Sequence, residues 1–107
     1  MTKNWDKINE LIREGKLHIS DHGYDELSSD NLTVREIIAG VESGQVIENY
    51  PNYPKGPCVL VLQEDKNGHP IHVVWGVPKI ALFPAVLVTA YRPNPEKWKD
   101  GFRRRKK

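Results

Sequence analysis

The spacing of the apolar residues changes at Gly44. Before this glycine, apolar residues recur three or four positions apart, as on one face of a helix, whereas after it they form the short runs typical of β-strands. A chain whose helices precede its strands favours an α+β domain, in which the helices pack on one face of an antiparallel sheet. The 107 residues suffice for one hydrophobic core, so we expect a single domain over residues 1–107.

Three helices are predicted in the N-terminal part of the chain. The first covers residues 5–13, because the apolar positions of "WDKINELIR" have helical spacing. The second begins at Ser20 or Asp21, both of which are favourable N-cap residues. The third begins at Thr33, which forms a capping-box pattern with the glutamate three positions later, and it ends at Gly44.

About four antiparallel strands are predicted after the helices. The run "CVLVLQED" is nearly all apolar, which indicates a central, covered strand, and Asn67-Gly68 in the next turn is a strong hairpin signal. After the last strand, "PEKWKDGF" predicts a short helix over residues 95–102, with Pro95 in its first turn. The strands are expected at residues 45–50, 58–65, 71–77 and 85–93, and a brief extended segment at residues 17–19.

The charge of the chain is unevenly distributed. Residues 96–107 hold seven of the sixteen Lys and Arg and two of the fourteen acids, a net charge of +5, which leaves −3 for residues 1–95. We therefore expect an ordered body over about residues 4–100 and a basic tail at 101–107, which suits a polyanion such as nucleic acid. A frayed, solubilising C-terminus is the alternative interpretation. The candidate RNA-binding residues are Lys99, Arg103, Arg104 and Arg105.

Two aromatic residues lie among these basic ones. Trp98 and Phe102 could stack on bases while the neighbouring basic residues contact phosphates. They suit docking on the sheet equally well, and we favour docking for the aromatics and solvent exposure for the terminal "RRRKK".

Several classes of protein are disfavoured by composition. Cys58 is the only cysteine, so an internal disulfide and a cysteine-based metal cluster are excluded and a reducing, cytoplasmic location is expected. The longest mostly apolar stretch, Ile80 to Ala90, is interrupted by Pro84 and is too short to span a bilayer, so no membrane association is expected. No signal peptide and no cofactor fingerprint is evident, and we expect no cofactor.

Two of the four histidines, His18 and His22, stand four residues apart. A helix carrying such a pair can bind a metal ion, but here Ser20 and Asp21 are predicted to begin the helix between the two histidines, which disfavours a shared face. His22 falls in the first helical turn, where the positive end of the helix dipole lowers the pKa of imidazole toward the range of a proton carrier. The metal site remains an alternative, and His22 is the stronger candidate for proton transfer.

Further candidates lie on the last two predicted strands. If the apolar residues of "IHVVWG" face the core, His72 faces the other way. By the same alternation, Thr89 and Tyr91 share one face with Leu87. Arg92, at the strand end, has a planar guanidinium suited to holding a phosphate, and the alternative is a surface ion pair with an acid of the body.

Six short segments in a particular order resemble the DUF4258 family of small bacterial proteins. They are "SDHG", "NLTVREI", "GQVIENY", "CVLVL", "IHVV" and "VTAYRP", followed by a tryptophan and an arginine-rich end, and the resemblance covers about residues 15–105. The family looks like a distant relative of the RelE-like (barnase/RelE-type) toxin superfamily. That resemblance implies helices packed on a curved antiparallel sheet and metal-independent RNA cleavage, often opposed by an antitoxin protein.

The resemblance also implies a set of site residues. We assign one proton transfer each to His22 and His72, phosphate binding to Arg92 with help from the arginines of the tail, and stacking or hydrogen bonding to Tyr91. The expected partners are RNA or the ribosome and an antitoxin. Glu26 and Asp30 depart from the arginines that the family often carries there, which motivates the alternative of a non-catalytic protein-interaction module. A histidine-based metal-binding protein is the third hypothesis. The candidates carried over are His22, His72, Thr89, Tyr91 and Arg92.

Overall fold

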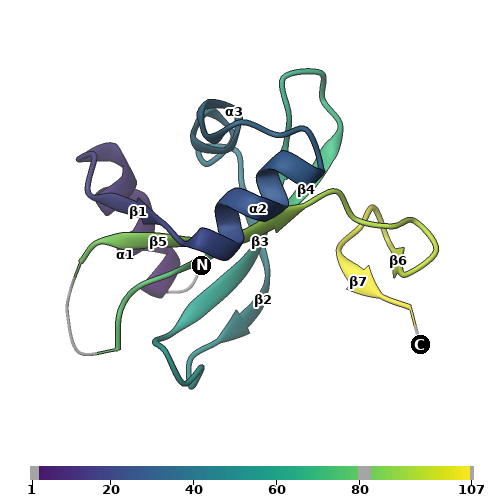
Figure 1. Cartoon of the computed structure of the whole chain (residues 1–107). Helices are drawn as coiled ribbons and strands as arrows, with labels where there is room; N and C mark the ends of the chain where they lie inside the picture. Colours follow the sequence, from purple (N-terminus) through teal and green to yellow (C-terminus); the bar gives the residue numbers. More distant parts are fainter. Residues whose placement is uncertain (1–2, 80–82, 107) are drawn as a thin grey trace.

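A computed structural model describes residues 3–79 and 83–106, without the side chains of Lys3, Asn4, His22, Tyr24, Glu26 and Ser29. The described residues form three helices and a five-stranded sheet, which confirms the predicted α+β class (Figure 1). The helices are α1 (Lys3–Arg13), α2 (Asp21–Ser29) and α3 (Val34–Ala39). None of these helices has the length and apolar character needed to cross a bilayer.

The sheet has the strand order β1-β5-β4-β3-β2. The four predicted strands form an antiparallel meander, as expected, and their bounds are β2 (Gln45–Tyr50), β3 (Cys58–Glu64), β4 (Pro70–Gly76) and β5 (Ala85–Tyr91). The extended segment becomes a fifth strand, β1 (Leu17–Ile19), which pairs in parallel with β5. The sheet is therefore mixed, because this one pairing is parallel and the others are antiparallel. β1 satisfies backbone groups along the outer edge of β5.

The helix ends follow local rules, with one correction. Gly15 has a φ of 76°, and bonds from Gly15 N–H to Ile12 and from Lys16 N–H to Leu11 close α1 in a Schellman motif. Thr33 caps α3 by accepting the Glu36 N–H at 3.2 Å. The prediction that this helix continues to Gly44 is wrong.

The reason for the early stop of α3 lies at Gly40. A Cβ on this residue would stand 2.9 Å from the Gln63 amide nitrogen, so the absence of a side chain lets the helix end approach β3 closely. Beyond Gly40 the chain continues in tight turns, with bonds from Val41 N–H to Ile38 and from Gly44 N–H to Val41. The helix ends before Val41, but Val41 is still buried in the core beside Ile37.

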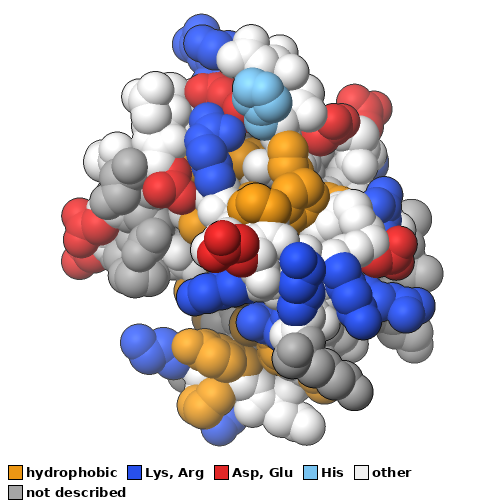
Figure 2. Space-filling model, turned by 90° about the vertical axis from the view of Figure 1, so that its right-hand side faces the viewer, with side chains coloured by type: hydrophobic (Ala, Val, Ile, Leu, Met, Phe, Trp, Pro, Cys, Tyr) orange, Lys and Arg blue, Asp and Glu red, His pale blue; other side chains and the backbone are white. Residues whose placement is uncertain are grey.

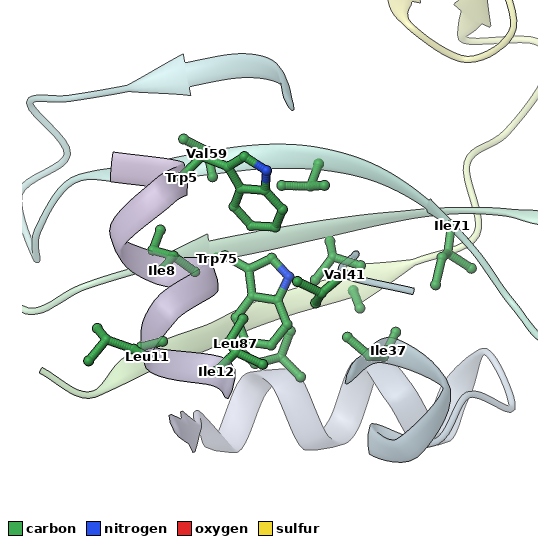
Figure 3. Close-up of a cluster of buried hydrophobic side chains, with 14 of the residues drawn as sticks. Trp5, Ile8, Leu11, Ile12, Ile37, Val41, Val59, Ile71, Trp75 and Leu87 are labelled. Atoms are coloured by element: carbon green, nitrogen blue, oxygen red, sulfur yellow. The ribbon is translucent and has the colours of Figure 1, made fainter. Parts of the chain in front are cut away.

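The helices cover one face of the sheet, here called the helical face, and bury an apolar core there (Figure 3). Trp75 is fully buried at its centre, and its indole N–H donates to Gln63 Oε1 at 3.0 Å. Gln63 in turn donates to the Ile37 carbonyl at 2.7 Å, so this buried amide side chain ties β3 to α3. The largest members of the core are Trp5, Ile8, Ile37, Ile71, Trp75 and Leu87.

The opposite face, here called the second face, is organised in rows of directly paired residues, which share a face. The Gly76 row is Tyr50, Cys58, Gly76 and Val86; the Val74 row is Glu48, Leu60, Val74 and Thr89; the His72 row is Gln45, Leu62, His72 and Tyr91. The prediction that Leu87 shares a face with Thr89 is wrong. A register shift skips Val88, so Leu87 pairs with Trp75 and turns to the helical face.

The C-terminal segment forms a hairpin of β6 (Trp98–Lys99) and β7 (Arg104–Arg105) rather than the predicted helix over residues 95–102. Figure 1 shows this hairpin at the end of the molecule far from α1. The turn between the strands has positive φ at Asp100, Gly101 and Phe102, at 55°, 66° and 68°, which is incompatible with a right-handed helix. Trp98 is 6% exposed, so the favoured docking of this aromatic residue on the sheet is confirmed.

Candidate functional site

His72 lies on the second face in β4, the middle strand of the sheet, and is fully buried. Its cross-strand neighbour Tyr91 meets the imidazole edge to face, with ring centroids 5.3 Å apart. Trp98 from β6 contacts the same ring at 4.3 Å, with the two planes at 82°. The C-terminal hairpin therefore closes over a histidine that the sheet alone would leave facing solvent.

Hydrogen bonds assign the proton of this imidazole. His72 Nε2 lies 2.8 Å from the Phe102 carbonyl oxygen, and Nδ1 lies 3.2 Å from the Tyr91 hydroxyl. Because a carbonyl only accepts, Nε2 carries the hydrogen and Nδ1 accepts from Tyr91. Burial lowers the pKa of His72 and raises the pKa of Tyr91, so both groups are neutral at pH 7.

A second polar group lies beside this pair. Arg105 in β7 binds Glu48 with both ends of its fork, Nε to Oε2 at 2.8 Å and Nη2 to Oε1 at 3.0 Å. The Tyr50 hydroxyl donates to the same carboxylate. The bonds from Arg105 lower the pKa of Glu48 and outweigh the opposing effect of its burial. Glu48 is therefore ionised at neutral pH.

The two groups form one constellation, here called the second-face cluster and made of Glu48, Tyr50, His72, Tyr91 and Arg105. Glu48 and His72 occupy neighbouring rows, and the charge of Glu48 partly opposes the lowering of the His72 pKa. Trp98 joins the groups, since the Arg105 guanidinium lies 4.7 Å from the centre of its ring. The cluster thus combines a carboxylate, a guanidinium and a phenol–imidazole pair, which are the components of acid–base chemistry on an anionic substrate.

Arg92 does not join the cluster. Its Nη1 lies 2.8 Å from Asp65 Oδ2, its Nε donates to the Asp30 carbonyl, and its backbone N–H donates to the Asp30 carboxylate. Asp65 also accepts two backbone N–H groups in the β3–β4 turn, and these bonds, led by that of Arg92, lower its pKa to about 2. The alternative interpretation of Arg92, an ion pair with an acid of the body, is the arrangement in the structure. Adjacent strand residues point to opposite faces, so Arg92 leaves the face that Tyr91 occupies.

The other candidates are divided between described and undescribed parts of the chain. Thr89 lies on the second face, one row from Tyr91. The backbone of His22 is in the first turn of α2, but its side chain lies outside the described part of the structure, so its convergence with His72 remains a prediction. His18 is an exposed residue of β1. Among the side chains that the structure describes, no group of three His, Cys, Asp or Glu could hold a metal ion.

All four predicted RNA-binding residues lie in the C-terminal hairpin. Figure 2 shows a band of Lys and Arg side chains across the face of the molecule that carries this hairpin. Arg103 donates to Gln45 at 3.0 Å, and Arg104 lies 3.7 Å from Asp100 in a solvent-exposed pair. Lys99 is exposed, and Arg105 belongs to the cluster. The basic hairpin and the cluster therefore share Arg105. Residues 103–106 are all exposed, as expected for this end of the chain, although Arg103, Arg104 and Arg105 each have a polar partner.

Two members of the cluster were not foreseen. Glu48 and Tyr50 stand two residues apart in "QVIENY", and this spacing predicts a shared face. The register shift that skips Ile47 and the pairing with a hairpin 57 residues away are long-range features with no local signal. Alternation within the segment predicts that Glu48 and Tyr50 share a face, but it cannot identify Arg105 as the partner of Glu48.

Residues 19–92 match the family described as "Domain of unknown function (DUF4258)". The chain belongs to this family. The resemblance drawn from the six sequence segments is thereby confirmed. A search of curated proteins and a search of solved structures each found no match. The matched DUF4258 region contains Glu48, His72 and Tyr91 and stops before the hairpin that supplies Trp98 and Arg105.

Proposed function

We propose that this DUF4258 protein is a toxin-type, metal-independent ribonuclease and that the second-face cluster is its catalytic site. The observation that carries the proposal is the convergence of the His72–Tyr91 pair with the Glu48–Arg105 pair beside a band of basic residues. The band supplies the electrostatic attraction that nucleic-acid binding requires. The cluster supplies a base, an acid and a cation.

The burial of each group suggests its role. Arg105 is more than half exposed and would bind the scissile phosphate, exchanging part of its bond to Glu48. Glu48 would accept the proton of the ribose 2′-hydroxyl as the 2′-oxygen attacks phosphorus. Tyr91, protonated because burial raises its pKa, would turn its hydroxyl proton from His72 Nδ1 to the departing 5′-oxygen and donate it there. One P–O bond forms and one breaks, and the products are a 2′,3′-cyclic phosphate and a free 5′-hydroxyl.

For His72 we propose a positioning role in place of the direct proton transfer expected from the sequence. Its side chain is fully buried between Tyr91, Trp98 and the hairpin turn, so it does not contact a substrate in this arrangement. It accepts a hydrogen bond from Tyr91 and thereby fixes the direction of the phenol. We therefore treat His72 as a positioning residue and Tyr91 as the catalytic acid.

The test is RNA cleavage by the purified protein in excess chelator. Tyr91→Phe and Glu48→Gln should each lower the rate about 10²–10⁴-fold, the usual contribution of a general acid or base. Arg105→Ala should lower it as well, whereas the exposed controls Glu64→Gln and Arg13→Ala should not. His72→Ala should reduce kcat with little change in KM. If naked RNA is not cut, the same variants are compared on translating ribosomes, and equal activity of all proteins in both assays would refute the assignment.

A non-catalytic protein-interaction module is the second candidate. It is favoured by the burial of His72 and by the occupation of the Arg105 fork by Glu48, which leave the cluster internally satisfied. In this case the partner would be a protein, as an antitoxin is. Expression should then cause no growth arrest, and arrest that Tyr91→Phe relieves would count against this candidate.

A further inference from the structure

A cavity of about 400 Å³ opens on the second face, next to the cluster. Its floor includes Cys58, Gly76 and Val86, which are paired directly across β3, β4 and β5. Gly76 contributes only backbone to this floor, and a Cβ there would stand 3.1 Å from the Cβ of Cys58. Burial raises the pKa of the Cys58 thiol, and the floor is therefore uncharged at neutral pH.

The walls differ from the floor. Val77 and Val88 add apolar surface, whereas Tyr53 and Lys55, from the loop between β2 and β3, bring a phenol ring and an ammonium group. Tyr53 is 45% exposed, so its ring is accessible at the rim. A volume of this size, an apolar floor and a few polar groups at the edge are typical of a pocket for a small molecule.

The pocket and the cluster lie on one surface at a defined spacing. Tyr50 belongs to the same row as Cys58, and Glu48 belongs to the next row. Residues two positions apart on a strand are separated by roughly 7 Å, so the floor lies one row from Glu48 and two rows, roughly 14 Å, from Tyr91. A nucleotide whose phosphate lies at Arg105 can therefore extend its base toward the pocket.

We propose that this pocket binds the base of the nucleotide next to the scissile phosphate, with Tyr53 at the rim and Lys55 beside the backbone of the RNA. The inference rests on the proposed ribonuclease function and deepens it, because it assigns the part of the substrate that the pocket recognises. An apolar floor favours the face of a base by dispersion and desolvation, and an exposed tyrosine offers a second aromatic surface. The lysine matches the charge of the attached phosphate. A peptide side chain is the competing occupant and is an outcome of the test.

The walls imply a preference of a particular kind. Apolar surface distinguishes bases by size rather than by hydrogen-bond pattern. A purine should therefore bind about fivefold more tightly than a pyrimidine, because its second ring removes more apolar area from water. The cleavage pattern should show the same preference beside the cut.

The experiment is an NMR titration of the full-length protein, labelled with ¹⁵N, with each of the four nucleoside 5′-monophosphates. The backbone amides of Gly56 and Gly76 should shift, and AMP and GMP should bind more tightly than CMP and UMP. Val86→Phe places an aromatic ring over Gly76 and should abolish the shifts. Lys55→Ala should weaken binding about two- to fivefold, as for an exposed charge, whereas Lys66→Ala in the β3–β4 turn should not.

The outcomes separate this inference from the proposed function. Nucleotide binding at the two glycines without cleavage of RNA would support the pocket and count against the ribonuclease. Cleavage of RNA without these shifts, and with a base preference in Val86→Phe equal to that of the wild type, would overturn the nucleotide pocket. It would leave the ribonuclease proposal intact. Shifts confined to the basic hairpin would overturn it too, as would a pocket filled only by a peptide. If Val86→Phe does not fold, Tyr53→Ala at the exposed rim serves as the second variant and should weaken the binding of all four nucleotides.

Discussion

The two faces of one sheet are built on different principles. The helical face is closed by apolar side chains, and its buried amide, Gln63, has both of its polar atoms satisfied. The second face is closed only in part, by a short hairpin that contacts His72 through Trp98 and a carbonyl bond, pairs with Glu48 and donates to Gln45. Alternation along the same strands therefore separates the residues that stabilise the fold from the residues that can carry chemistry.

The largest expected effect is on the helical face. Trp75→Ala removes a fully buried indole and should lower the free energy of unfolding by about 3–5 kcal/mol. Urea denaturation measures this loss. Trp75→Phe should cost less, although it leaves Gln63 Oε1 without its donor. A loss below 1 kcal/mol in Trp75→Ala would show that the core is not centred on this residue.

The matched change on the second face is Trp98→Ala. It should lower the free energy of unfolding by about 1–2 kcal/mol, because the hairpin can detach while the core stays closed. Amide exchange at Lys106, whose N–H donates to the Lys97 carbonyl, should become faster in this variant. If Trp98→Ala destabilised the protein as much as Trp75→Ala, the two faces would form a single cooperative unit and the contrast between them would be lost.

The pH dependence of stability should also differ between regions. Burial lowers the folded-state pKa of His72 below 6.5, so the unfolded chain takes up this proton first and stability falls as the pH decreases below 6.5. The decrease of stability from pH 7.5 to pH 5 should be smaller in His72→Phe than in the wild type. Thermal unfolding across this pH range measures it. Glu48 and Arg105, which face His72, do not titrate in this range.

Asp65 provides the control for that experiment because it acts in another pH window. Its folded-state pKa is about 2. The stabilisation of the fold by its charged form is therefore complete above pH 3.8 and is lost as the pH falls toward 2. Asp65→Asn should therefore keep the slope between pH 7.5 and 5 and remove part of the acid sensitivity below pH 4. A change of the slope near neutrality in this variant would contradict the assignment to His72.

The smallest expected effect on stability is at the Glu48–Arg105 pair. Arg105 is 60% exposed, and such pairs contribute about 1 kcal/mol or less. Glu48→Gln should therefore unfold at nearly the wild-type urea concentration, and the remaining difference should shrink in high salt. Combined with the loss of cleavage proposed above, this result would separate chemistry from stability at one residue. A large destabilisation would instead assign Glu48 to the fold.

Much of the fold could be predicted from local patterns. The end of α1 at Gly15, the cap at Thr33 and the turn at Asn67-Gly68 each depend on a few neighbouring residues. The predictions failed where distant segments intervene. The third helix stops early because Gly40 packs against Gln63, and the C-terminal residues form a hairpin because Trp98 docks on His72.

The candidate site divides along the same line. Periodicity is enough to place His72 on the face away from the core and to pair Thr89 with Tyr91 on one side of a strand, because a side chain's direction depends on its own backbone. Only the tertiary structure decides that Glu48 pairs with Arg105 and that Arg92 pairs with Asp65. It also decides that Leu87 faces the core, because a bulge shifts the register of β5. Cross-strand neighbours come from positions far apart in the chain, so their identity depends on register and on bulges that no local spacing reveals.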